Sequence, residues 1–180
     1  MKIKGLFLSL LIAGPLLASA QNIELPTPQK EGGLPLMQAL AQRASTRQFD
    51  TDRAIEPQTL SNLLWAAWGY NREDKRTAPS ALNRQEISLY VITAQGVYTY
   101  DARQNVLNQV AAGDFRHSSG KQPFAQTAPL NIVFVADLDK APGNDMMFVD
   151  CGCIVQNIYL YCASAGLGSV VRGSFDAAEL

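Results

Sequence analysis

One segment constrains the fold of this chain more than any other, the almost wholly apolar stretch from Asp145 to Ala165. Its length and composition predict a helix, and the glycines of Gly166-Leu167-Gly168 predict where that helix ends. A helix that is apolar all round has to be covered on every side. One domain of this size covers such a helix poorly by itself, so burial between two copies of the chain is the simplest arrangement. We therefore expect a homodimer.

The start of the chain has the pattern of an export signal. Lys2 and Lys4 form a positively charged start, Gly5–Leu17 is a short apolar run, and residues 18–20 (Ala-Ser-Ala) match a cleavage site. The run is too short to span a bilayer comfortably, so we expect no stable membrane anchor. We expect residues 1–20 to be a signal peptide that is cut after Ala20, which makes the protein exported and periplasmic. Losing two lysines would take the net charge from -1 to -3.

Composition narrows the class of protein. Apolar residues make up 47% of the chain and charged residues 17%, which is typical of one folded domain. The 15 Lys and Arg residues are balanced by 16 Asp and Glu residues, so we expect no nucleic-acid partner. The single histidine, His117, excludes a multi-histidine metal site and leaves one candidate base for a Ser-His-Asp triad.

The three cysteines, Cys151, Cys153 and Cys162, all fall within the predicted helix. Cys151 and Cys153 project from opposite sides of such a helix. Cys151 and Cys162 would be roughly 16 Å apart along it, whereas a disulfide needs Cα atoms within about 7 Å. We expect them to be small core residues, with a redox or metal-binding role as the alternative.

The rest of the pattern predicts an α+β fold. Residues 21–34, rich in proline and glycine, are expected to be an exposed lead-in to a domain that covers residues 35–180. The periodicity predicts helices at Pro35–Arg43 and Pro57–Trp68, a hairpin of Ile87–Ala94 with Val97–Tyr100, and strands at Leu130–Ala136 and Ser169–Arg172. The continuous apolar run of Leu130–Ala136 is typical of a strand that is covered on both faces, and we expect Ser169–Arg172 to be buried as well.

Three polar clusters contain the side chains that are suited to binding a ligand. Arg43, Ser45 and Arg47 follow the first helix, and two guanidinium groups with a hydroxyl can surround a phosphate. The segment 76–85 contains Asn83, whose amide both donates and accepts and so suits the edge of a heterocycle. The segment 171–174 has a glycine after a predicted strand, where a flat ligand can approach the backbone. Considered singly, these clusters are also explained as a solvated helix end, a capped loop and a strand end.

Taken together, the clusters resemble the nitroreductase family of FMN-dependent oxidoreductases, in particular its small exported members. The resemblance runs from about Leu36 to Phe175. Its motifs are Arg-x-Ser-x-Arg-x-Phe at residues 43–49, Pro-Ser-x-x-Asn-x-Gln at residues 79–85, the strand pair at residues 87–101, and the helix with Asp150, Gly152, Gln156, Asn157 and Leu160 that ends in Ala165-Gly166-Leu167-Gly168. The resemblance implies a three-layer α/β/α fold with a mixed, mainly antiparallel sheet and a long apolar central helix.

The resemblance also implies what the protein does. It implies a homodimer with FMN at the interface, where the flavin carries the redox chemistry and no side chain acts as a catalytic residue. The expected cofactor-binding residues are Arg43, Ser45, Arg47, Ser80, Asn83, Gln85, Val171, Arg172 and Gly173, with Asn83 contributed by the partner chain. The acceptor would be a small electron-poor molecule such as a nitroaromatic or a quinone, with NAD(P)H as a candidate electron donor. The alternatives are a flavin-dependent dehydrogenase that oxidises a peptide heterocycle, and a secreted binding domain that has lost its flavin.

The chain departs from the family pattern in two places. Many relatives have an acidic residue where this chain has Arg172, which bears on the charge of the preferred substrate. Relatives also continue beyond the position of Leu180 with a further helix and strand that reach across the dimer, so a C-terminal arm is expected to be missing here.

Overall fold

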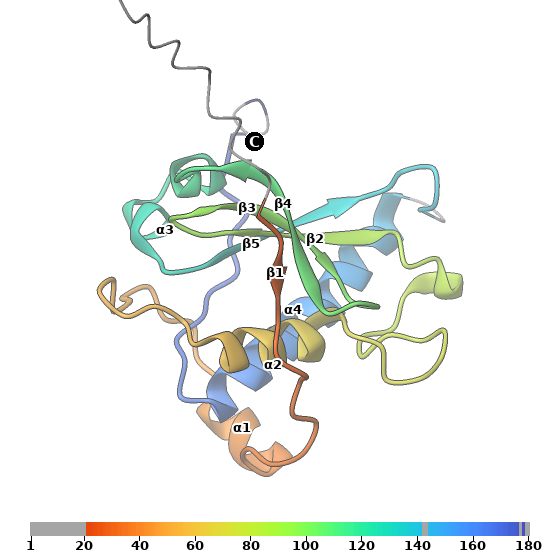
Figure 1. The fold of residues 1–180 in the computed structure, drawn as a ribbon. Coiled ribbons are helices and arrows are strands. Elements are labelled where there is room, and N and C mark those ends of the chain that lie inside the picture. The colour runs from red at the N-terminus through yellow and green to blue at the C-terminus, as the bar shows by residue number, and fades with distance from the viewer. Residues whose placement is uncertain (1–20, 142–143, 177, 179–180) are drawn as a thin grey trace, which may run out of the picture.

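The computed structural model describes residues 21–141, 144–176 and 178, so the predicted signal peptide lies outside the described residues. Its elements, in chain order, are β1 (Ile23–Glu24), α1 (Leu36–Gln42), α2 (Pro57–Trp68), the short 3-10 helix η1 (Ala81–Asn83), β2 (Ile87–Ile92), β3 (Gly96–Asp101), β4 (Val106–Ala112), the 3-10 helix η2 (Arg116–Ser119), α3 (Pro123–Thr127), β5 (Asn131–Ala136) and α4 (Asn144–Ser164). This arrangement confirms the α+β class (Figure 1).

The strands form one five-stranded sheet in the order β1-β4-β3-β2-β5. The predicted hairpin is confirmed, with Val91 of β2 opposite Tyr98 of β3. Every strand pair among the described residues is antiparallel, so the sheet itself is not mixed. The parallel contact that is found is an isolated bridge between Ser45 and Ser169, outside the sheet.

The hydrophobic core lies between one face of the sheet and the helices. Alternate residues of β2, Ile87, Leu89 and Val91, are at most 2% exposed and point to this face. Leu64 of α2 and Ile154 of α4 pack in the same cluster. Each such side chain contributes roughly 1.5–3 kcal/mol through burial. Figure 1 shows α1, α2 and α4 gathered on one side of the sheet, in line with their contacts with one another and with β2.

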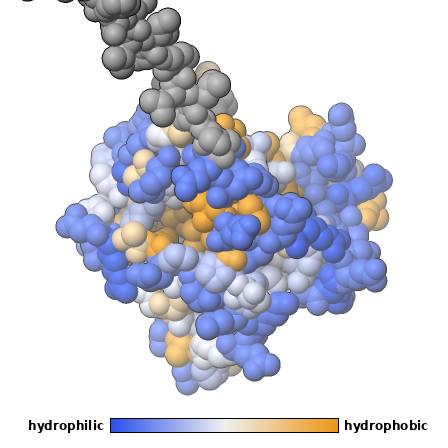
Figure 2. Space-filling model, in the orientation of Figure 1, coloured by the Kyte–Doolittle hydropathy of each residue, from blue (hydrophilic) through white to orange (hydrophobic). Residues whose placement is uncertain are grey.

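The opposite face of the sheet is covered by helices at one end. Asn131, at the start of β5, is 5% exposed and donates a hydrogen bond from Nδ2 to the Ala125 carbonyl oxygen of α3. Further along β5, Val135 is 44% exposed. The expectation of a strand covered on both faces is therefore wrong for this chain, because the face of β5 opposite the core is partly exposed beyond Asn131. Figure 2 shows hydrophobic residues gathered near the middle of the visible surface.

The long helix α4 confirms the strongest sequence prediction, but the chain does not cover it on every side. Ile154 and Cys162 are buried, whereas Phe148 is 69% and Val149 is 54% exposed. All three cysteines are free, as predicted; Cys151 and Cys153 are half-buried rather than fully in the core. Burial raises the pKa of the Cys162 thiol to about 11, so this group is a neutral core side chain at ordinary pH.

Two local predictions fail. Ser169–Arg172 is not a strand: apart from the bridge at Ser169 the segment is irregular, and Val171 is 57% exposed. Its backbone and side chains are held by hydrogen bonds to other parts of the chain instead of by a ladder. The sequence pattern also did not predict β4. The apolar positions of Val106–Ala112 are interrupted by Asn108 and Gln109, and the pairing of this strand with β3 is a non-local contact.

The lead-in at residues 21–34 is largely exposed, as expected, yet it is tied to the domain. Its strand β1 pairs with β4, with Ile23 opposite Leu107. Further along, the Ser61 hydroxyl donates to the Pro26 carbonyl, and the Leu34 N–H donates to Ser164 Oγ at 2.7 Å. The segment therefore connects the outer edge of the sheet to the C-terminal end of α4.

A buried carboxyl group predicts how stability depends on pH. Glu86 is 1% exposed, and neither of its carboxyl oxygens has a hydrogen-bond partner among the described residues. Burial, with nearby Asp150 adding to it, raises the pKa of the Glu86 carboxyl above its ordinary value. The folded state then binds a proton that the unfolded state has released, so the free energy of unfolding falls as pH rises from about 4.3 through the raised pKa.

We therefore expect Glu86→Gln to flatten this pH dependence. Above the raised pKa it should also stabilise the fold by roughly 1–3 kcal/mol, because a neutral amide avoids the cost of burying an ionised carboxyl without a partner. Urea unfolding across the acidic to neutral range measures it, with Glu31→Gln at an exposed position as the control. An equally steep pH dependence in wild type and Glu86→Gln would contradict this assignment.

Candidate functional site

The first polar cluster assembles around Tyr159, a residue of α4 that is 7% exposed. The Tyr159 hydroxyl lies 3.0 Å from Ser45 Oγ and accepts a hydrogen bond from the Val171 N–H at 2.8 Å. Arg43, which ends α1, has its Cζ 5.3 Å from the centre of the Tyr159 ring. Residues from the first and third predicted clusters therefore meet at one tyrosine.

The backbone brings these two clusters together as well. Thr46 donates its N–H to the Ser169 carbonyl at 2.9 Å, which accompanies the parallel bridge between Ser45 and Ser169. The turn after α1 and the segment after α4 therefore lie side by side.

Arg43 and Arg47 have no carboxylate partner among the described residues. Arg43 is half-buried and Arg47 is exposed. The ion pairs found in residues 21–141, 144–176 and 178 involve other cations, such as Arg116, which pairs with Asp114 at 2.7 Å. Two guanidinium groups without carboxylates, on the same short turn as the Ser45 hydroxyl, form a donor set that fits an anionic oxygen group such as a phosphate.

The second cluster is a loop whose centre is Gln85. Its Oε1 accepts from the Tyr70 hydroxyl at 3.1 Å and from Arg76 Nε at 2.9 Å. Its Nε2 donates to the Asp74 carbonyl at 2.6 Å and to Asn83 Oδ1 at 3.1 Å. This amide is therefore fully used inside the protein. Gln85 was expected to bind the cofactor, and these four hydrogen bonds instead suit a role in holding the 76–85 loop in place.

The loop has an unusual backbone. Leu82, Asn83 and Gln85 have φ angles of 53°, 55° and 49°, a left-handed conformation that non-glycine residues adopt rarely. The Ser80 hydroxyl accepts the Gln85 N–H at 3.0 Å and so closes the turn. Such strain persists only where surrounding contacts enforce it and gathers at functional sites, which marks this loop as a candidate ligand-binding segment.

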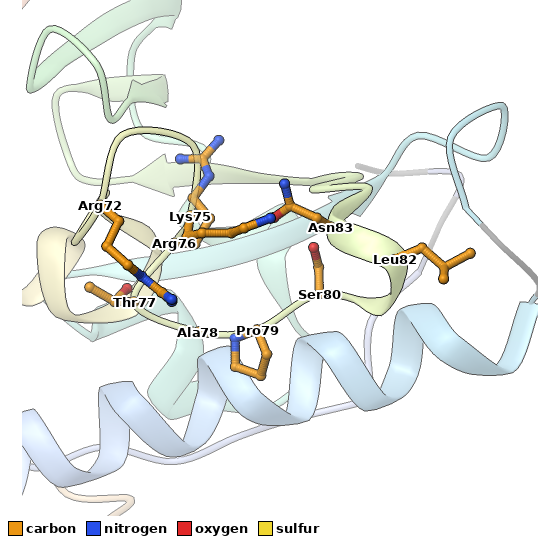
Figure 3. Close-up of a pocket in the computed structure, with 9 residues that line it drawn as sticks. All are labelled: Arg72, Lys75, Arg76, Thr77, Ala78, Pro79, Ser80, Leu82 and Asn83. Atoms are coloured by element: carbon orange, nitrogen blue, oxygen red, sulfur yellow. The ribbon is translucent and has the colours of Figure 1, made fainter.

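A pocket of about 500 Å³ opens beside this loop (Figure 3). Its lining combines three basic, three polar and three apolar residues: Arg72, Lys75 and Arg76; Thr77, Ser80 and Asn83; Ala78, Pro79 and Leu82. Figure 3 shows the Leu82 side chain pointing away from the other labelled residues, in agreement with its 78% exposure. The Thr77 hydroxyl is buried and has no partner among the described residues, so it is an open hydrogen-bonding group in the lining.

Arg76 is a structural cation within this pocket. Its Cζ lies 4.0 Å from the centre of the Tyr70 ring and 4.9 Å from that of Trp68. Its Nη1 donates to the Trp68 carbonyl at 2.9 Å. Burial lowers the pKa of this guanidinium, with Arg103 adding to the effect, but arginine stays protonated in proteins. The pocket therefore has a fixed positive charge in its wall.

Arg172 is also committed to the protein. Its Nη1 donates to the Ser119 carbonyl at 3.0 Å and its Nη2 to Asn131 Oδ1 at 2.8 Å. A Cβ on Gly120 would collide with Arg172 Nη1, so the absence of a side chain at Gly120 makes room for it. Burial lowers the pKa of Arg172. We expected this residue near the cofactor; its side chain in fact joins the 169–174 segment to η2 and β5.

The first and second clusters do not converge within one chain. Asp150 of α4 holds the second loop, because its Oδ2 accepts the Ala81 N–H at 2.8 Å. Tyr159, which holds the first cluster, follows nine residues later in the same helix. That spacing corresponds to about 14 Å along the axis and about 180° around it. Arg43, Ser45 and Val171 therefore lie together, whereas Ser80, Asn83 and Gln85 lie at a distance on another side of α4.

Comparison with known proteins gives this arrangement a family. The model of the family described as "Nitroreductase family" matches residues 40–180, which include both clusters and α4. This chain belongs to the nitroreductase family. The assignment makes it an oxidoreductase and confirms the resemblance inferred from the sequence motifs.

Individual relatives support the nitroreductase assignment. A candidate nitroreductase of Ralstonia eutropha is 40% identical, with a TM-score of 0.82 over 90% of this chain and 80% of that one. A candidate nitroreductase of Methanocaldococcus jannaschii is 26% identical over 91% of this chain and 89% of its own length. A candidate nitroreductase of Desulfovibrio desulfuricans, solved in complex with FMN, shares the fold at 24% identity, with a TM-score of 0.57 over 79% of this chain and 70% of that one.

Sequence reasoning missed Tyr159 in this nitroreductase. The residue lies in a segment that was interpreted as apolar core, and its aromatic ring fits that interpretation. One feature of the sequence could have indicated its role. A tyrosine in a buried helix needs a hydrogen-bond partner for its hydroxyl, so its presence predicts that a polar segment packs against this part of the helix.

Proposed function

We propose that this nitroreductase binds FMN between two copies of the chain and passes hydride or electrons through it to a small electron-poor acceptor. The observation that carries the proposal is the pair Arg43 and Arg47, which have no carboxylate partner among the described residues. Arg43 lies by the ring of Tyr159, whose hydroxyl contacts Ser45, and Arg47 follows two residues later on the same turn. A terminal phosphate is the ligand that this donor set suits best. The FMN complex of the Desulfovibrio relative supports the choice of ligand.

The second half of the site would come from the partner chain. Asn83, at the edge of the basic pocket, donates from Nδ2 to the Asp74 carbonyl and accepts at Oδ1 from Gln85, which leaves one N–H and one oxygen lone pair for the ring end of a flavin. It lies far from Arg43 along and around α4. The N–H groups of Arg172 and Gly173 have no hydrogen-bond partner in the described part of the chain and could face the ring, whereas the Val171 N–H is already bound to Tyr159. A Cβ on Gly173 would meet nothing within 4 Å, so the backbone there is open to a flat ligand.

Exposed apolar residues support a dimer. Phe148 and Val149 are exposed on α4, and Leu36 and Met37 of α1 are 61% and 75% exposed. By length and composition alone, α4 is long and apolar enough to cross a membrane, with a mean hydropathy of 1.3 over Asp145–Ser164. Its packing against α1, α2 and β2 identifies it instead as the core helix of a domain, with an exposed stripe left for a partner.

The chemistry follows from this assembly. When bound, flavin supplies the hydride and electron transfer, and the protein contributes binding and orientation. Arg43, Ser45 and Arg47 would hold the phosphate end, and Asn83 of the other protomer would fix the ring end. Nitroaromatics and quinones are the proposed acceptors, and NAD(P)H is the electron donor proposed for assays of the purified protein. We also propose that residues 1–20 direct the protein to the periplasm, where a donor other than free NAD(P)H would be needed.

The identity of the cofactor is the first test. We expect the purified protein, after reconstitution with a mixture of flavins, to retain non-covalent FMN and to reject FAD, because the sequence has no Gly-x-Gly-x-x-Gly dinucleotide motif. Mass spectrometry of the ligand released by heat identifies it. Recovery of FAD would overturn the choice of ligand, and recovery of no flavin would favour a binding domain.

The phosphate assignment predicts a pattern among three arginines. Arg43→Ala and Arg47→Ala should each weaken FMN binding by roughly 1.5–3 kcal/mol, about 10- to 150-fold in Kd, because each removes a charge-assisted hydrogen bond. Arg53, an exposed arginine outside the motif, provides the matched control Arg53→Ala. Quenching of FMN fluorescence measures all three. Equal losses at the three positions would show a general basic surface instead of a phosphate site.

A further inference from the structure

Tyr159 joins three parts of the chain that are far apart in sequence. Ser45 is 114 residues before it and Val171 is 12 residues after it, and both reach its hydroxyl. Arg43 lies over its ring. The tyrosine itself lies in α4 and is buried, at 7% exposure. It is therefore a buried side chain that contacts the polar groups of the first cluster and the segment after α4.

The hydrogen bonds at this hydroxyl have a definite direction. The Val171 N–H can only donate, so the Tyr159 oxygen accepts from it. If Ser45 also donated to that oxygen, the phenolic hydrogen would be left buried without an acceptor, since no other partner of this hydroxyl occurs among the described residues. Tyr159 therefore donates to Ser45 Oγ. The Ser45 hydroxyl hydrogen is then free to donate outward, toward an anion.

The ring of Tyr159 acts on Arg43 in a similar way. A guanidinium 5.3 Å from the centre of an aromatic ring is within the range of a cation–π interaction. This contact holds Arg43 beside Ser45 without consuming its hydrogen bonds, as a carboxylate would. The two groups that are expected to meet a phosphate are thus oriented by one side chain that does not touch the ligand itself.

We propose that Tyr159 is the positioning residue of the phosphate end of the cofactor site, acting through the Ser45 hydroxyl and the Arg43 guanidinium. The inference rests on the proposed binding of FMN. It adds that the site is pre-organised before the cofactor arrives, because the contacts of Tyr159 are made within the protein.

The first test compares two tyrosines of the same helix. Tyr159→Phe keeps the ring and removes the hydroxyl, and Tyr161→Phe is the matched control, since the Tyr161 hydroxyl donates to the Thr59 carbonyl at 3.3 Å, away from the site. We expect the Kd for FMN to rise about tenfold in Tyr159→Phe and to change less than about twofold in Tyr161→Phe. Equal effects of the two substitutions would overturn the proposal.

The second test asks whether Tyr159 acts through Ser45. Ser45→Ala should weaken FMN binding in the wild-type background and add almost nothing in the Tyr159→Phe background, because the serine has then already lost its orientation. Simple additivity of the two losses would show independent roles and contradict the proposal. A merely structural tyrosine would produce no such coupling.

The third test needs no flavin. In the flavin-free protein, the Val171 amide should exchange slowly with solvent in wild type and Tyr161→Phe, and about tenfold faster in Tyr159→Phe. Fast exchange in wild type would overturn the pre-organised geometry. Slow exchange in a wild-type protein that fails to bind FMN would instead overturn the proposed function while leaving the Tyr159 geometry intact, so the two failures are distinguishable.

Discussion

The packing of α4 against α1, α2 and β2 is the constraint on which the rest of the structure depends. Ile154 is completely buried at the centre of this contact, and hydrogen bonds from Asn157 to the Ala66 carbonyl and from Tyr161 to the Thr59 carbonyl fix α4 on α2. The same helix carries Asp150 and Tyr159, which hold the two polar clusters. The positions of both polar clusters therefore follow from how this one apolar helix is packed.

The arginines of the molecule divide into two groups with different physical roles. Arg76 and Arg172 are partly buried and satisfied by neutral acceptors, and burial lowers the pKa of each. Partly desolvated cations of this kind are tolerated because neighbouring oxygen atoms accept some of their N–H groups, two in Arg76 and two in Arg172. Arg43 and Arg47 have no ion pairs among the described residues and keep their hydrogen-bonding capacity for a ligand. The distinction separates side chains that build the site from side chains that bind.

Much of the fold was predictable because its strongest signals are local. The predicted helix Pro57–Trp68 coincides with α2, and the apolar segment at Asp145–Ala165 with α4. The family followed from four motifs in order along the chain, two short polar ones, a strand pair and the long helix, and the family match confirms it. Non-local contacts caused the failures: β4 depends on its partner strands, and Ser169–Arg172 is held by side chains from elsewhere.

The candidate site was predictable as a set of residues and less so as a set of roles. Gln85 and Arg172 lie in the motifs, but four and two hydrogen bonds, respectively, commit their side chains to the protein. Tyr159 is outside every polar motif and nevertheless connects the residues of the first cluster. A motif identifies which segments meet a ligand, whereas the hydrogen-bond geometry decides which atoms are free to bind it.

The central claim is that one cofactor site is built from two chains, and mixed dimers test it most directly. One chain would carry Arg43→Ala and Arg47→Ala, the other Asn83→Ala, and two different affinity tags would isolate the mixed dimer. If each of the two sites is built from both chains, all three substitutions lie in the same site of the mixed dimer and the other site is wild type. The mixed dimer should then bind about one FMN with wild-type affinity. If each site lies within one chain, every site in the mixed dimer is damaged, and the absence of any wild-type affinity would contradict the account.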